Sequence, residues 1–173
     1  SDHGMSEVDP NLFIDTNTLP RPKGFRRVNS STRVMYYRRD PKADVAALAA
    51  TLREASNGRY RVVSDETLAE RHYKHHPAVA ELIIETDPPR LFRHGGAQGP
   101  DLRGMHGYPA EVEDMAAFLV AIGPGFSVGK VIPKAHQLDV YPIAATLLDL
   151  SLPAGIVSQG GTLRDALAQP IRE

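Results

Sequence analysis

The chain contains 173 residues, with 20 basic and 21 acidic side chains that give a formal net charge of −1. This length fits one domain or one large piece of a bigger domain, and a core that buries roughly 70% of the unfolded surface needs no disulfide or metal. The composition, 42% hydrophobic and 24% charged, excludes a disordered or collagen-like chain. The near-neutral charge argues against a nucleic-acid polymer as a partner, because phosphate binding needs a basic surplus.

The N-terminal part of the chain is expected to be mostly loop. Residues 6–23 contain several prolines and one short apolar run at 12–14, which predicts a loop with one short strand.

Residues 32–86 predict a mixed α/β subdomain with helices on a small sheet. Strands at 32–37, 60–63 and 79–86 alternate with helices at 45–55 and 64–73. Asp40-Pro41 can cap and start the first helix, and Asn57-Gly58 supplies its stop.

The rest of the chain begins with an irregular, glycine-rich and proline-rich stretch over residues 87–107. The near-continuous apolar run at 115–122 predicts a strand buried on both faces. Apolar residues at helical spacing over 140–150 predict a helix that Pro153 ends, and a last helical turn is expected at 162–168.

Two short motifs contain residue types that bind metal ions. Asp2-His3 places a carboxylate beside an imidazole, and a positive φ at Gly4 would let both point into one site. His106 precedes Gly107-Tyr108 and follows the glycine-rich stretch. Taken alone, each motif is more simply explained as a polar terminus or an ordinary loop histidine. The histidine-rich tract at 71–77 is interpreted as a solvated helix end, because its basic residues would repel a metal ion.

Taken together, the motifs resemble a known family. Residues 1–5 read Ser-Asp-His-Gly-Met, and Met-His-Gly-Tyr follows at 105–108. Segments at 114–118, 123–126 and 139–142 continue the same order. This series resembles the metal-ligand and closing motifs of the type I phosphodiesterase / nucleotide pyrophosphatase family, within the alkaline phosphatase superfamily.

The resemblance implies an α/β fold, namely part of an alkaline-phosphatase-like doubly wound core with an inserted mixed α/β subdomain. Residues 1–31 would be a metal-motif segment and loop of the core, 32–86 the inserted subdomain, and 87–173 the C-terminal part of the core. It also implies two divalent metal ions, expected to be zinc, with Asp2 and His3 on one ion and His106 on the other. Such nitrogen and oxygen ligands without thiolates suit zinc.

The chain departs from the family pattern in two respects. The family's nucleophilic threonine, its first metal aspartate and its Asp-x-x-x-His pair all lie upstream of the Ser-Asp-His-Gly-Met motif, and no such residues precede Ser1. We therefore expect a C-terminal part of the catalytic domain that contains no catalytic nucleophile and is inactive by itself. Pro109 stands where the family commonly has aspartate.

The resulting hypothesis is a metal-dependent phosphodiesterase or nucleotide pyrophosphatase that acts on a small phosphodiester or nucleotide. The alternatives are a phosphonoacetate hydrolase or phosphomonoesterase of the same superfamily, and a non-catalytic α/β binding module. The family's usual setting favours the periplasm or the outside of the cell. Without its sheet neighbours, the apolar run at 115–122 is expected to be exposed and to favour self-association.

Overall fold

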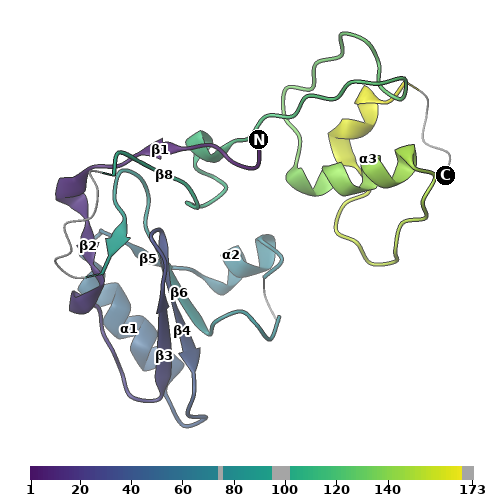
Figure 1. Ribbon diagram of the computed structural model, residues 1–173. Coiled ribbons are helices and arrows are strands. Elements are labelled where there is room, and N and C mark those ends of the chain that lie inside the picture. Colours follow the sequence, from purple (N-terminus) through teal and green to yellow (C-terminus); the bar gives the residue numbers. More distant parts are fainter. Residues whose placement is uncertain (74–75, 95–101, 169–173) are drawn as a thin grey trace. The chain divides into compact units, whose positions relative to one another are not determined.

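The computed structural model describes residues 1–73, 76–94 and 102–168, and Figure 1 traces the chain through them. The chain divides into two compact units, Ser1–Phe118 and Leu119–Glu173. The predicted divisions at 31/32 and 86/87 remain predictions.

The first unit is built on a four-stranded antiparallel sheet. Its strands, in spatial order, are β3 (Phe25–Asn29), β4 (Arg33–Arg38), β6 (Leu82–Glu85) and β5 (Arg61–Val62). β6 pairs with β4 on one side and with β5 on the other, so the last strand of the subdomain lies inside the sheet.

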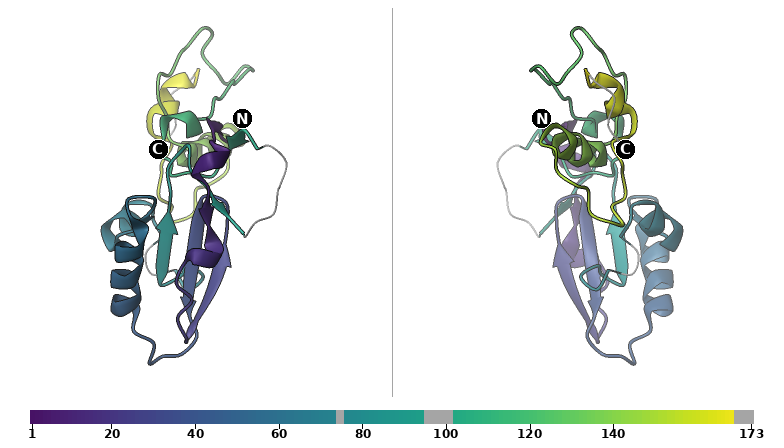
Figure 2. Two further views of the ribbon diagram at one scale, coloured as in Figure 1. Left: turned by 90° about the vertical axis from the view of Figure 1, so that its left-hand side faces the viewer. Right: turned by 90° about the vertical axis from the view of Figure 1, so that its right-hand side faces the viewer.

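Two helices cover opposite faces of this sheet. Alternate residues of a strand face opposite sides, and Val34 and Tyr36 of β4 accordingly pack in the cluster that contains Leu52 of α1 (Val45–Ser56). Met35 and Tyr37 instead pack in the cluster that contains Leu68 of α2 (Asp65–Glu70). Figures 1 and 2 show α1 lying along its face of the sheet.

The predicted α/β alternation over residues 32–86 is confirmed, with two differences at its start. α1 begins at Val45, where the apolar spacing begins, but its N-cap is Asp44, whose carboxylate accepts the Ala47 N–H, whereas the expected cap Asp40 accepts the N–H of Lys42 in a turn. The sheet also contains β3, which the sequence analysis missed. Its two adjacent arginines conceal the alternation, and pairing with β4 supplies its hydrogen bonds.

Two short strand pairs fasten the remaining parts of the first unit. β1 (Ser6–Glu7) is antiparallel to β8 (Gly104–Met105), and β2 (Ile14–Asp15) is parallel to β7 (Phe92–Arg93). The strand predicted at 12–14 is instead the end of a 3₁₀ turn, η1 (Pro10–Leu12), followed by β2. Further 3₁₀ turns lie at η2 (Thr16–Thr18) and η3 (Glu113–Met115).

The predicted buried strand at 115–122 is wrong. η3 ends at Met115 and residues 116–122 have no regular structure. A strand needs a hydrogen-bonded neighbour, and none of the described residues forms a strand pair with this run. Its side chains are largely exposed, as expected for a run without sheet neighbours: Phe118 70%, Leu119 59%, Val120 70% and Ile122 91%.

In its described residues, 119–168, the second unit contains one α-helix, α3 (Val140–Leu147), between η4 (Gln137–Asp139) and η5 (Gly161–Ala166). α3 ends well before Pro153 because Asp149 is left-handed at φ 53°. The N–H groups of Asp149 and Leu150 donate to the carbonyls of Thr146 and Ala145, which closes the helix as a Schellman motif. The helical turn expected at 162–168 corresponds to η5.

Some predictions fall partly outside the described residues. These are the central part of the tract at 71–77 and residues 95–101 of the irregular stretch. α2 ends at Glu70, earlier than the predicted residue 73.

The side chain of Leu52 is fully buried against the sheet. We therefore expect its truncation to lower the free energy of unfolding strongly. Leu52→Ala should lower the free energy of unfolding by about 2–5 kcal/mol, measured by urea denaturation. The exposed Glu54 on the same helix provides the control, and Glu54→Ala should change stability by less than about 0.5 kcal/mol. Equal effects of the two substitutions would contradict the packing described for α1.

Candidate metal-binding site

The pairing of β1 with β8 brings together two motifs that are distant in sequence. Ser6 lies opposite Met105 and Glu7 opposite Gly104. The strands are antiparallel, so the residues just before β1 lie near those just after β8. Asp2 and His3 precede β1, and His106 follows β8 directly.

The imidazole rings of His3 and His106 are in contact. Their centroids lie 3.8 Å apart and their planes differ by 9°, which is a stacked arrangement. Two parallel rings at this distance can present nitrogen atoms to two ions a few Å apart, as binuclear hydrolytic sites require. The structure thus brings together the three predicted ligands.

The hydrogen bonding of His3 leaves one ring nitrogen suited to a metal ion. Its Nδ1 lies 2.8 Å from the carbonyl oxygen of Gly4. A carbonyl oxygen only accepts hydrogen bonds, so Nδ1 carries the proton and the lone pair is on Nε2. Metal-binding histidines commonly donate their other N–H to a backbone carbonyl, which fixes the orientation of the ring.

Asp2 lies beside that free nitrogen. Its Oδ2 is 3.6 Å from His3 Nε2. Two ligand atoms about 2.0–2.2 Å from a tetrahedral zinc ion are about 3.4 Å apart, so this spacing fits a shared ion. A hydrogen bond from its own backbone N–H lowers the pKa of Asp2, which keeps the carboxylate ionised.

The metal motif depends on a close backbone approach at Gly4. Its N–H donates to the carbonyl of Met115 at 3.1 Å, and a Cβ at this position would lie 1.9 Å from the carbonyl oxygen of Asp114. The expected positive φ at Gly4 is wrong, because this residue is absent from the positive-φ glycines of the described chain. Glycine is needed at this position because there is no room for a Cβ atom, and not because the backbone has an unusual conformation.

Two supporting side chains were not identified from the sequence. Ser6 is buried, and its hydroxyl donates to Asp114 Oδ2 at 2.9 Å. Ser6 directly follows the five-residue motif, and Asp114 opens one of the segments of the family resemblance. Their proximity depends on the β1–β8 pairing and has no signal in local sequence.

A small apolar cluster contains residues next to the two motifs. Val8, Leu91 and Tyr108 are buried in it, with Met105 and Met115 packed against them. Burial raises the pKa of Tyr108 to about 12, so the phenol stays protonated and donates to the carbonyl of Arg90 at 2.7 Å. This anchors the backbone two residues after His106.

An ion-pair network connects the segment after His106 to the α/β subdomain. Arg71 Nη1 contacts the buried carboxylate of Glu85 at 2.9 Å, while its Nη2 contacts Glu111 at 2.9 Å. Arg61 contacts Glu85 from the other side at 2.7 Å. Arg71 thereby connects the end of α2 to the chain that follows His106.

The remaining described histidines lie in other settings. His94 is within hydrogen-bond distance of Thr16, and His136 caps η4 by accepting the N–H of Leu138. Within residues 1–73, 76–94 and 102–168, no group of three or more potential ligands surrounds a single point suited to a metal ion.

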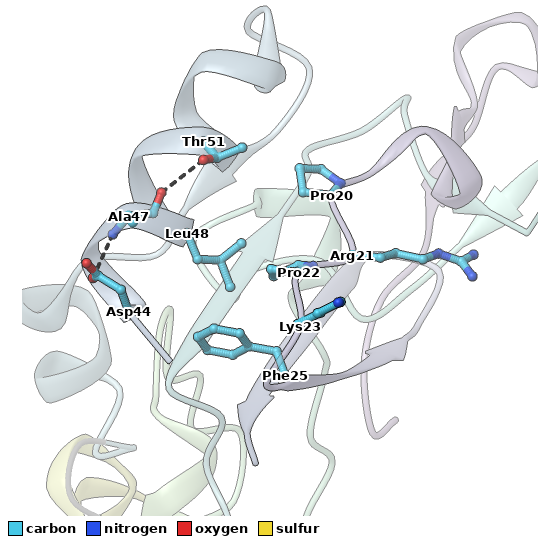
Figure 3. A pocket seen from close by; sticks show the side chains of 9 residues that line it. All are labelled: Pro20, Arg21, Pro22, Lys23, Phe25, Asp44, Ala47, Leu48 and Thr51. Atoms are coloured by element: carbon cyan, nitrogen blue, oxygen red, sulfur yellow. Dashed lines mark hydrogen bonds between the residues drawn. The ribbon is translucent and has the colours of Figure 1, made fainter. Parts of the chain in front are cut away.

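One hollow in the described structure lies away from these motifs. It occupies about 460 Å³ between the loop that precedes β3 and the first half of α1. Figure 3 shows Pro22, Phe25 and Leu48 between the loop and the helix, with Arg21 pointing away. Its lining includes none of the three predicted ligands, so it is not the candidate metal site.

Comparison with known proteins identifies the family. Residues 1–109 match the type I phosphodiesterase / nucleotide pyrophosphatase family. The chain belongs to this family. The family predicted from the motifs is therefore confirmed.

The curated relatives are longer proteins of related name. Over 152 residues, the chain is 25% identical to the bis(5'-adenosyl)-triphosphatase enpp4 of Xenopus laevis, covering 87% of this chain and 32% of the relative. It is 24% identical to human ectonucleotide pyrophosphatase/phosphodiesterase family member 5, covering 87% of this chain and 31% of the relative. The chain thus spans about a third of the length of these relatives.

Solved structures establish the fold of this family member. Human ectonucleotide pyrophosphatase/phosphodiesterase 5 superimposes with a TM-score of 0.79 at 22% identity, over 98% of this chain and 44% of that protein. The murine protein, as an inactive variant in complex with AMP, gives 0.77 at 23% identity over 97% of this chain and 44% of that protein. The chain is part of an alkaline-phosphatase-like α/β fold, as predicted. Among its described residues, no helix has the length and apolar character needed to cross a bilayer.

The tight approach at Gly4 predicts that a single methyl group disrupts the site. Gly4→Ala should lower the free energy of unfolding by about 1–3 kcal/mol and remove the nuclear Overhauser contacts between the His3 and His106 rings. Gly58→Ala is the control: its φ of 70° makes alanine unfavourable, so stability should also fall, but the added Cβ has no heavy atom within 4 Å and the ring contacts should persist. Intact ring contacts in Gly4→Ala would contradict the described approach.

The Arg71–Glu111 pair predicts a pH-dependent contribution to stability. Arg71 lowers the pKa of Glu111, so the stabilisation is present above the ordinary value of 4.5 and is lost as the pH falls through the lowered value. Between about pH 6 and about pH 3, Glu111→Gln should therefore lose less stability than the wild type in urea denaturation. Parallel losses would mean that the pair is broken in solution.

Proposed function

We propose that this chain supplies three metal ligands to a two-metal phosphodiesterase or nucleotide pyrophosphatase that acts on a small phosphodiester or nucleotide. Asp2 and His3 would hold one divalent ion, expected to be zinc, and His106 the other. The observation that carries the proposal is the ring contact of His3 and His106 with the Asp2 carboxylate beside it.

The chemistry of the donor atoms supports this assignment. A carboxylate oxygen and two imidazole nitrogens suit zinc, and the Gly4 carbonyl holds His3 in the tautomer that leaves Nε2 free. Bound metal ions of this kind lower the pKa of a nucleophile and stabilise the charge on transferring phosphoryl oxygens. The role of this chain is then to orient ligands on a fixed backbone.

The substrate class follows from the family and from the relatives' names. One curated relative is a bis(5'-adenosyl)-triphosphatase, and the structure of one relative was solved in complex with AMP. We propose nucleotides or small phosphodiesters as substrates of the protein to which this chain belongs. The name of the human relative, an ectonucleotide enzyme, supports the periplasmic or extracellular location expected from the motifs.

Because the chain matches only about a third of its curated relatives, we propose that it acts as the C-terminal part of a catalytic domain. The nucleophilic threonine of the family would come from elsewhere in that domain. The 173 residues alone should therefore show no turnover.

Activity of the protein isolated from its native source tests this function. Bis(p-nitrophenyl) phosphate should be hydrolysed faster than p-nitrophenyl phosphate, EDTA should abolish the activity, and zinc should restore it. Faster hydrolysis of the monoester would favour the phosphomonoesterase alternative. Activity indifferent to EDTA would contradict the metal assignment.

Substitution of one ligand provides the matching test within the chain. In the same protein, His106→Ala should lower the turnover of the diester by orders of magnitude, because one ion loses its ligand. His76→Ala, which alters an exposed histidine outside the site, should leave turnover near the wild-type value. Similar turnover in both variants would reject His106 as a ligand.

A further inference from the structure

The backbone directly after His106 is hydrogen-bonded to two residues at the start of β4. The carbonyl oxygen of Gly107 accepts hydrogen bonds from Thr32 Oγ1 at 2.6 Å and from Arg33 Nη2 at 3.0 Å. Thr32 is 3% exposed, so its hydroxyl is shielded from water. Gly107 has a φ of 85°, in the left-handed region, and its turn directs the carbonyl to these donors.

Thr32 is itself fixed by the sheet. Its carbonyl accepts the N–H of Thr86 at 3.1 Å, and the carbonyl of the preceding Ser31 accepts the N–H of Phe92 at 2.7 Å. Arg33 is the first residue of β4 and pairs with Glu85 in β6. The two donors therefore lie at the hydrogen-bonded start of an interior strand and not in a free loop.

His106 consequently lies between two anchored stretches of backbone. Before it, Met105 is paired with Ser6 in the β1–β8 ladder. After it, Gly107 is held by Thr32 and Arg33, and Tyr108 is buried. The side chain of His106 is exposed and stacks on the ring of His3, so its backbone anchors determine how the two rings meet.

We propose that Thr32 and Arg33 are positioning residues that set the direction of His106 through the Gly107 carbonyl. The inference rests on the proposed function insofar as His106 is a metal ligand. It gives the α/β subdomain a role in the site, since residues at the start of β4 hold the backbone next to a candidate ligand. Supporting hydrogen bonds around metal ligands typically change metal affinity by about 10–100-fold when removed.

The test compares substitutions at two buried threonines that each donate to a backbone carbonyl. Thr32→Val removes the donor to Gly107 at nearly constant volume, and Thr32→Ser retains it. Thr86→Val is the matched control, because the Thr86 hydroxyl donates to the Arg59 carbonyl at 2.7 Å, not to Gly107. Arg33→Met tests the second donor.

Two readouts on the full-length protein to which this chain belongs distinguish positioning from general stability. In the metal-free protein, the imidazole carbon and proton signals of His3 and His106 report their stacking through mutual ring-current shifts. Binding of zinc alone, measured by calorimetry, reports the consequence for affinity. The thermal midpoint of each variant gives the loss of stability for comparison.

We expect Thr32→Val and Arg33→Met to shift the His106 signals towards free-imidazole values and to weaken zinc binding on the order of 10-fold. Thr32→Ser and Thr86→Val should keep both properties, although Thr86→Val loses about as much stability as Thr32→Val. Unchanged His106 signals in Thr32→Val would overturn the inference.

The outcome also separates this inference from the proposed function. If zinc leaves the His3 and His106 signals of the wild type unchanged, the metal assignment fails, while altered signals in Thr32→Val would still demonstrate positioning. If zinc moves those signals equally in the wild type and in Thr32→Val, only the positioning inference fails.

Discussion

The antiparallel contact between β1 and β8 is the interaction on which the candidate site depends. Only two residues of each strand pair, yet they connect the first residues of the chain to a segment beyond residue 100. Asp2 and His3 lie just before one strand and His106 just after the other. The pairing therefore brings the residues that flank the two strands close together.

The four-stranded sheet and α2 support the segment that follows this short strand pair. Thr32 and Arg33 hold the Gly107 carbonyl, and Arg71 connects buried Glu85 to Glu111. Both contacts reach the chain after His106 from the α/β subdomain. The subdomain thus contributes to the geometry of the site although it contains none of the predicted ligands.

The sequence allowed the α/β subdomain to be predicted because its signals are local. Helical periodicity and the Asn57-Gly58 stop define α1, and Ser64 caps α2. β3 was missed because its strand character arises from pairing with β4, and the strand at 115–122 was wrongly predicted because apolar content does not supply a hydrogen-bonded neighbour. The three candidate ligands were assigned through resemblance and stay predictions, while the Gly4 approach, the Ser6–Asp114 bond and the Gly107 contacts depend on tertiary structure.

The central claim is that Asp2, His3 and His106 bind two metal ions. Its most direct test is a crystal structure of the natively isolated protein crystallised with zinc, with diffraction data recorded at the zinc absorption edge. The account predicts two anomalous peaks, one about 2.0–2.2 Å from His3 Nε2 and an Asp2 oxygen, the other at the same distance from a His106 nitrogen. Peaks on other residues, or a metal on His3 Nδ1, would contradict it.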